Sequence, residues 1–132
     1  MAVLVDTDQL IEIERGSARG RDLDAVIGDE ERAISVISVS ELLHGVLRAS
    51  EADRMRLLSF AENLLGAMRP VPIDEQTARV HAAVGAQLAA DGLSIGTHDL
   101  WIAATALSRD LGVATHNVRD FGRIPGLRVV SP

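Results

Sequence analysis

Acidic residues follow or adjoin short apolar runs at four places in this chain of 132 residues. Asp6 follows the run 2–5, Glu41 and Asp120 also fall just beyond predicted strands, and Asp99 falls at a predicted helix start. In a parallel sheet the carboxyl ends of the strands and the following helix starts meet at one edge, so we expect these carboxylates to converge. Two carboxylates about 4 Å apart repel by roughly 4 kcal/mol at an effective dielectric near 20. Such a cluster needs a cation.

The ligand type indicates which cation and which chemistry. A site built only from carboxylate oxygens selects a hard ion, Mg²⁺ or Mn²⁺, which keeps several waters and is typically completed by substrate phosphate. The chemistry predicted is metal-assisted hydrolysis of a phosphate ester. One ion would deprotonate water, and the same ion or a second one would stabilise the departing oxygen.

Each acid, taken singly, also has an ordinary structural role open to it. Helix caps, first-turn acids and turn formers are common uses of these residue types. These roles are a helix cap for Asp6 or Asp8, a capping box with Ser38 for Glu41, a favourable helix dipole after Thr97 for Asp99, and a turn for Asn117 and Asp120.

Strands that alternate with helices predict the fold class. Strands are predicted at 2–5, 33–37, 113–115 and 127–130, with an edge segment at 68–73 that contains Pro70 and Pro72. Helices are predicted at 9–14 behind Asp8, from near Arg21 to 27, at 38–48, 52–65 and 75–90, and at 98–111 with Thr97 as its cap. This order predicts one domain, residues 1–132, with three α/β/α layers around a mainly parallel central sheet.

Composition excludes several function classes. The absence of cysteine excludes disulfides and thiolate metal sites. No signal peptide or membrane-spanning run is visible, so we expect a cytoplasmic protein with no membrane partner. The net charge of −6 argues against holding nucleic acid by bulk attraction, although all 13 basic residues are arginine, a good bidentate phosphate donor. With one Trp, two Phe and no Tyr, the core must consist mainly of aliphatic residues.

Four motifs occur in a specific order along the whole length of the chain. They are V-L-V-D-T-D, S-V-S-E-L-L-H-G, H-D-L-W-I-A-A-T-A and A-T-H-N-V-R-D-F. With these motifs the chain resembles PIN-domain ribonucleases, and its size and layout resemble the VapC-type toxins of bacterial toxin–antitoxin pairs. The resemblance implies an acidic quartet of Asp6, Glu41, Asp99 and Asp120 that binds Mg²⁺, with Asp6 and Asp99 as the surest ligands. It also implies that two polar residues orient the site, Thr115 and Asn117.

The same resemblance implies a reaction and partners. The reaction is endonucleolytic cleavage of RNA, and the partner is a small antitoxin whose C-terminal segment fills a groove of the toxin. Apolar helix surfaces over 42–65 fit such a partner, a homodimer interface or plain core packing. One motif departs from the usual T-R-N: His116 stands where the family has an arginine that could touch RNA phosphate. Arg15, Arg19 and Arg21 cluster near the first acidic loop and could meet the RNA backbone.

Two other functions remain open. A haloacid-dehalogenase-like phosphatase would use Asp6 as nucleophile and Asp8 as acid/base. Gln9 stands where that family has glycine, and the chain has no lysine. The other alternative is a PIN-like binding module that retains its acids but holds a partner without turnover.

Overall fold

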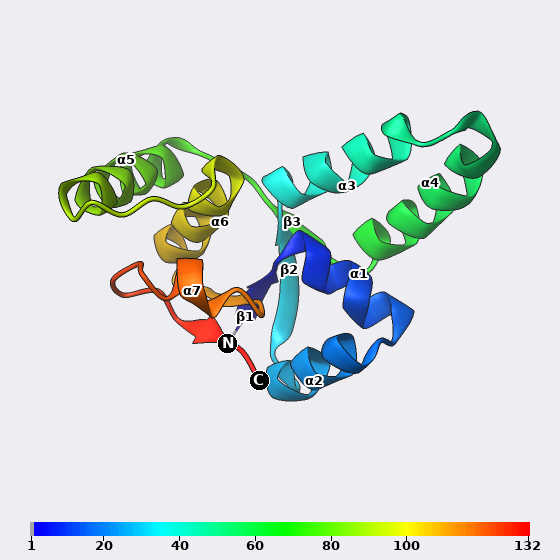
Figure 1. Cartoon of the computed structure of the whole chain (residues 1–132), viewed down its shortest axis with the longest axis horizontal. Coiled ribbons are helices and arrows are strands. Elements are labelled where there is room, and N and C mark those ends of the chain that lie inside the picture. Colours follow the sequence, from blue (N-terminus) through cyan, green and yellow to red (C-terminus); the bar gives the residue numbers. More distant parts are fainter. Residues whose placement is uncertain (1) are drawn as a thin grey trace.

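The computed structural model describes residues 2–132, and a parallel five-stranded sheet lies at its centre (Figure 1). The strand order is β3–β2–β1–β4–β5, so the first strand is the central one. All four strand pairs are parallel. The strands are β1 (Ala2–Val5), β2 (Glu31–Ser35), β3 (Arg69–Val71), β4 (Gly112–Ala114) and β5 (Val129–Val130).

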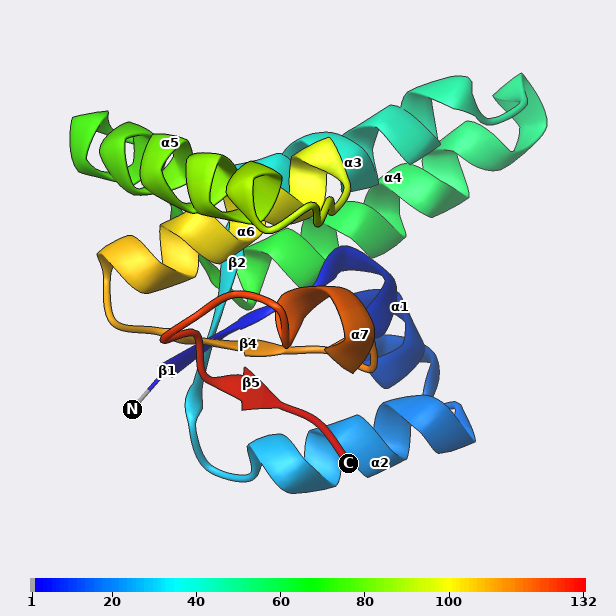
Figure 2. The ribbon, with the colours of Figure 1, turned by 60° about the vertical axis from the view of Figure 1, so that its left-hand side comes forward.

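Helices cover both faces of this sheet. Figure 2 shows α5 and α6 above the strands and α2 below them. The predicted three-layer α/β/α arrangement is therefore confirmed. In the described part of the chain the helices are α1 (Thr7–Arg15), α2 (Ala18–Ile27), α3 (Val36–Arg48), α4 (Glu51–Gly66), α5 (Glu75–Ala90), α6 (Thr97–Ser108) and α7 (Val118–Phe121).

Two apolar cores, one on each face, follow from the alternation of side chains along β1. Val3 and Val5 belong to the core shared with α1 to α4, and Leu4 belongs to the core shared with α6 and α7. All three side chains are buried. Phe121 of α7 is fully buried in the second core, and most of the other buried residues are aliphatic, as the composition predicted.

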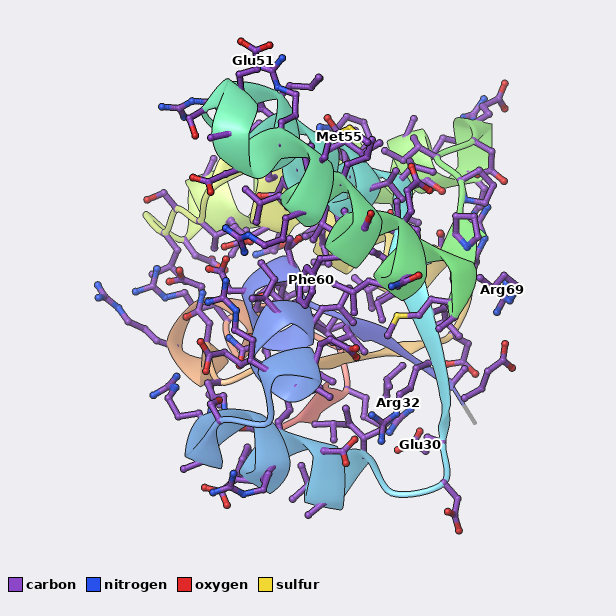
Figure 3. All side chains as sticks on the ribbon, turned by 90° about the vertical axis from the view of Figure 1, so that its right-hand side faces the viewer. Glu30, Arg32, Glu51, Met55, Phe60 and Arg69 are labelled. Atoms are coloured by element: carbon purple, nitrogen blue, oxygen red, sulfur yellow. The ribbon has the colours of Figure 1, made fainter. Side chains whose placement is uncertain are left out.

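Helices α3 and α4 form a hairpin that projects from the sheet (Figure 1). Near its tip Leu47 is 69% exposed and Met55 is 71% exposed. Figure 3 shows Phe60 on the side of α4 that faces α1, whereas Glu51 lies at the far end of the helix. The apolar surface predicted over 42–65 is thus divided: part of it packs in the core, and part of it is open.

The extended segment with two prolines is an edge strand, as predicted. Pro70 of β3 pairs with Ile34 of β2, and among residues 2–132 no strand lies on the other side of β3. Asp74 then caps α5, accepting a hydrogen bond from the backbone N–H of Thr77 at 2.9 Å. Within residues 2–132 no helix is both long enough and apolar enough to cross a bilayer.

Several predicted helix starts were wrong because a residue earlier in the chain caps the helix. Asp6, not Asp8, caps α1, and Ser17 caps α2, which therefore begins three residues before Arg21. Ser35 accepts from the N–H of Ser38 at 3.1 Å, so α3 begins at Val36 and β2 ends at Ser35.

Other corrections concern the second half of the chain. Thr97 is the first residue of α6 rather than its cap, and α6 ends at Ser108 rather than at residue 111. Strand β4 is shifted by one residue from the prediction, and only Val129–Val130 of the segment 127–130 pairs as β5. The short helix α7 replaces the turn expected at Asn117 and Asp120.

Candidate active site

Asp6 lies at the carboxyl end of the central strand and caps α1. Its Oδ1 accepts a hydrogen bond from the backbone N–H of Thr7 at 2.9 Å, and its Oδ2 accepts one from Thr115 Oγ1 at 3.1 Å. Burial, followed by the negative charge of Asp99, raises the pKa of Asp6 to about 6, although both hydrogen bonds act to lower it. The structural role and the proposed chemical role of Asp6 are thus compatible, because a cap leaves lone pairs on both oxygens.

Thr115 and Asn117 arrange the turn that follows β4. Thr115 is fully buried, and its Oγ1 accepts a hydrogen bond from the backbone N–H of Asn117 at 2.9 Å. Asn117 caps α7, with Oδ1 accepting from the Asp120 N–H at 3.4 Å and Nδ2 donating to Asp120 Oδ2 at 3.2 Å. Asp120 therefore lies in the first turn of α7, oriented by the asparagine and 3.7 Å from Arg123 Nη1.

Glu41 reaches the site from the second turn of α3. Its Oε1 accepts a hydrogen bond from Thr7 Oγ1 at 2.8 Å, and its Oε2 lies 3.3 Å from His98 Nδ1. Because α3 begins at Val36, Glu41 is not at the capping-box position expected from its spacing to Ser38. The ordinary capping explanation for Glu41 is therefore wrong.

Asp99 lies in the first turn of α6 and is electrostatically linked to the other acids. Burial raises its pKa, as do the charges of Glu41, Asp120 and Asp8, in that order, while His98 acts to lower it. The four acids singled out in the sequence are thus gathered at one edge of the sheet. They come from the end of β1 and from three different helices.

Asp8 is a further acid at this edge, which sequence analysis considered only as a cap or a phosphatase acid. It is exposed on the first turn of α1, and its charge raises the pKa of both Asp6 and Asp99. The signal that could have revealed it is the spacing D-x-D. Once Asp6 caps α1, Asp8 falls in the first turn beside it.

The donor set suits a hard divalent cation. Carboxylate oxygens are the ligands that Mg²⁺ and Mn²⁺ prefer, and a cation would relieve the repulsion that contributes to the raised pKa of Asp6 and Asp99. The side chains between residues 2 and 132, as they stand, form no group of three or more acidic or histidine ligands close enough to hold an ion. Coordination would therefore require these carboxylates to move closer together.

An apolar groove opens next to the acids, between α1, α3 and α4. It encloses a volume of about 370 Å³. Its apolar lining includes Ile11, Leu42 and Phe60, and Asp8 and Glu41 line it as well. The groove thus joins an apolar binding surface to the acidic edge.

Comparisons with known proteins place these features in context. A family model described as PIN domain matches residues 3–127. Ribonuclease VapC1 of Rickettsia felis is 33% identical over 132 residues, covering 99% of this chain and 96% of that protein. A Salmonella typhimurium protein named tRNA(fMet)-specific endonuclease VapC is 35% identical over 96 residues, covering 73% of this chain and 71% of that protein.

Solved structures agree with the fold. The crystal structure of VapBC-5 from Mycobacterium tuberculosis, a member of the VapBC family of toxin–antitoxin systems, matches with a TM-score of 0.80 and 32% identity. The match covers 99% of this chain and 98% of that chain.

Proposed function

The chain belongs to the PIN domain family, and we propose that it is an endoribonuclease toxin of a toxin–antitoxin pair, acting as one PIN-like domain over residues 1–132. The observation that carries the proposal is electrostatic. Asp6 and Asp99 both have a raised pKa because each is partly buried beside other carboxylates. Such an arrangement is costly unless a cation offsets the negative charge of the site.

We propose Asp6, Glu41, Asp99 and Asp120 as the metal-binding and catalytic acids, with Asp6 and Asp99 the principal ligands. Ribonucleases of this family are generally divalent-metal dependent. We propose Mg²⁺ as the natural ion and Mn²⁺ as a possible substitute, on the basis of the all-oxygen donors. When bound, the ion supplies an activated water and stabilises the departing oxygen of the phosphodiester.

The neighbouring polar residues would hold the acids in place. Thr115 donates to Asp6, Asn117 positions Asp120 from both its amide atoms, and Thr7 donates to Glu41. These hydrogen bonds leave lone pairs on the carboxylate oxygens available to a cation. Thr115 and Asn117 are therefore proposed as positioning residues.

RNA is the proposed substrate. The name of the Salmonella relative, a tRNA(fMet)-specific endonuclease, favours testing transfer RNA first. Sequence-specific recognition of RNA usually targets unpaired loops, whose bases are accessible. The phosphatase alternative, with Asp8 as acid/base, is not favoured by the family match over residues 3–127.

A cognate antitoxin is the proposed protein partner, and the groove between α1, α3 and α4 is its proposed binding site. Ile11, Leu42 and Phe60 would contact apolar side chains of the antitoxin, and Asp8 and Glu41 would accept from a basic residue. A homodimer is also proposed, supported by the exposed apolar side chains Leu47 and Met55 on the α3–α4 hairpin.

The experiment that tests the function is cleavage of total RNA and of purified transfer RNA by the antitoxin-free protein. The assay is run with Mg²⁺, with Mn²⁺ and with chelator, beside the Asp99→Asn variant. We expect discrete fragments that require a metal and disappear in the variant. If no fragment forms under any metal while the protein remains folded, the ribonuclease proposal is wrong, and a phosphomonoester assay then tests the phosphatase.

A further inference from the structure

The arginines of this chain divide into two groups by their contacts. Nine of them donate to a carboxylate, a hydroxyl or a backbone carbonyl. In the part of the chain that the structure describes, the side chains of four others make no hydrogen bond or ion pair, and all four residues are exposed. The nine are Arg21, Arg32, Arg54, Arg56, Arg69, Arg79, Arg109, Arg123 and Arg128. The four are Arg15, Arg19, Arg48 and Arg119.

Three of these four lie around the acidic edge. Arg15 lines the groove together with Asp8 and Glu41. Arg119 lies in α7, adjacent in sequence to Asp120. Arg48 is the exception, because it ends α3 at the projecting hairpin.

The third, Arg19, is linked through its backbone to His116, which lies in the turn before α7. The His116 Nε2 atom donates to the backbone carbonyl of Arg19 at 3.0 Å. This bond connects the turn before α7 to the start of α2, so Arg19 and Arg119 lie on segments that are held together. His116, which stands where the family usually has arginine, therefore makes a contact that links two segments carrying arginine.

An RNA substrate must approach a strongly acidic edge on a protein of net charge −6. Bulk attraction does not favour this approach, so local cations have to offset the repulsion of the phosphates. A guanidinium with free donors can bind phosphate in a bidentate manner. In each of the other nine arginines, at least one N–H of the guanidinium is already used within the protein, so fewer donors remain for phosphate.

We propose that Arg15, Arg19 and Arg119 form a phosphate-binding rim that holds the RNA backbone on either side of the scissile bond. This inference rests on the proposed ribonuclease function and states how its substrate is held. Arg48 has the same residue type, exposure and lack of partners but lies away from the acids, so it is the matched control.

The test measures RNA binding separately from cleavage. In an Asp99→Asn background, fluorescence anisotropy gives the Kd of a labelled single-stranded RNA between about 50 and 200 mM NaCl. The single variants Arg15→Gln, Arg19→Gln and Arg119→Gln, and the triple variant that combines them, are each compared with Arg48→Gln. Each lost phosphate contact is expected to make the slope of the log association constant against log salt about 0.7 less negative, which is about a fivefold increase in Kd near 0.1 M salt. Arg48→Gln is expected to change neither value.

The outcomes separate this inference from the function itself. If the triple variant has the same Kd and the same salt slope as Arg48→Gln, the rim is wrong, whether or not the wild-type protein cleaves RNA. If the triple variant loses affinity and salt dependence, the rim is supported. Cleavage by the wild-type protein, assayed in parallel with Mg²⁺ and Mn²⁺, decides the ribonuclease function independently.

Discussion

The hydroxyl of Thr115 donates a hydrogen bond to Asp6 Oδ2 at 3.1 Å, across 109 positions of the sequence. The bond joins the ends of the neighbouring parallel strands β1 and β4. It favours the ionised form of Asp6, whereas burial and the charge of Asp99 oppose that form more strongly. The site therefore holds a carboxylate that is well oriented and unfavourably charged in the absence of a cation.

Asp6→Asn should stabilise the metal-free protein above neutral pH. The pKa of Asp6 is about 6 in the folded protein against an ordinary 3.8, so the wild type loses stability as pH rises from about 4 to 6. The total loss is about 3 kcal/mol. Asparagine has no charge and still caps α1. Urea unfolding in chelator should show the variant more stable by up to that amount at pH 8 and nearly equal to the wild type near pH 4. An unchanged pH dependence in the variant would contradict the assignment of the raised pKa.

A divalent cation should reverse this order of stability. A metal that binds only the folded protein stabilises it by about 3 kcal/mol at about 100 times its Kd. Thermal unfolding with and without Mg²⁺ should show a large increase in Tm for the wild type and a small one for Asp6→Asn and Asp99→Asn. Glu51→Gln removes an exposed carboxylate at the far end of α4 (Figure 3) and serves as the control. Equal increases for all four proteins would exclude a metal site at these acids.

Thr115→Val should lower both stability and activity. Valine has the size of threonine but leaves the N–H of Asn117 and the Oδ2 of Asp6 without this partner in a buried position. The expected cost is about 1 to 3 kcal/mol of unfolding free energy. Thr115→Ser keeps the hydroxyl and should restore most of the cleavage rate. If serine and valine reduced cleavage equally, packing rather than the hydrogen bond would explain the role of Thr115.

Much of the fold could be predicted because its signals are local. The apolar run 2–5 predicted the central strand, and the Pro70 and Pro72 pair predicted an edge. The capping residue Asp74 gave the start of α5 correctly. Such signals depend on residues within one turn or one strand, and they are readable without knowledge of the rest of the chain.

The details of the site depend on contacts across long stretches of sequence, which the pattern does not contain. Nothing near Glu41 indicates that Thr7 donates to it, 34 positions earlier in the chain. The choice between Asp6 and Asp8 as the cap of α1 depends on where β1 ends in the sheet. Asp8 was absent from the predicted acidic set because that set followed the family resemblance, whereas the place of Asp8 beside Asp6 depends on this cap. The contact of His116 with the Arg19 carbonyl likewise depends on the turn before α7 lying against the start of α2.

Gly20→Ala should be strongly destabilising, because the backbone of α1 lies directly against this glycine of α2. A Cβ atom at residue 20 would lie 2.1 Å from the backbone oxygen of Glu12, so the two helices would have to separate. Overpacking of this kind costs about 1 to 3 kcal/mol. Gly45→Ala is the matched control, because a Cβ there meets nothing within 4 Å and alanine favours a helix interior by about 1 kcal/mol. Urea unfolding should therefore move in opposite directions for the two variants. A Gly20→Ala protein as stable as the wild type would show that α1 and α2 pack less closely than described.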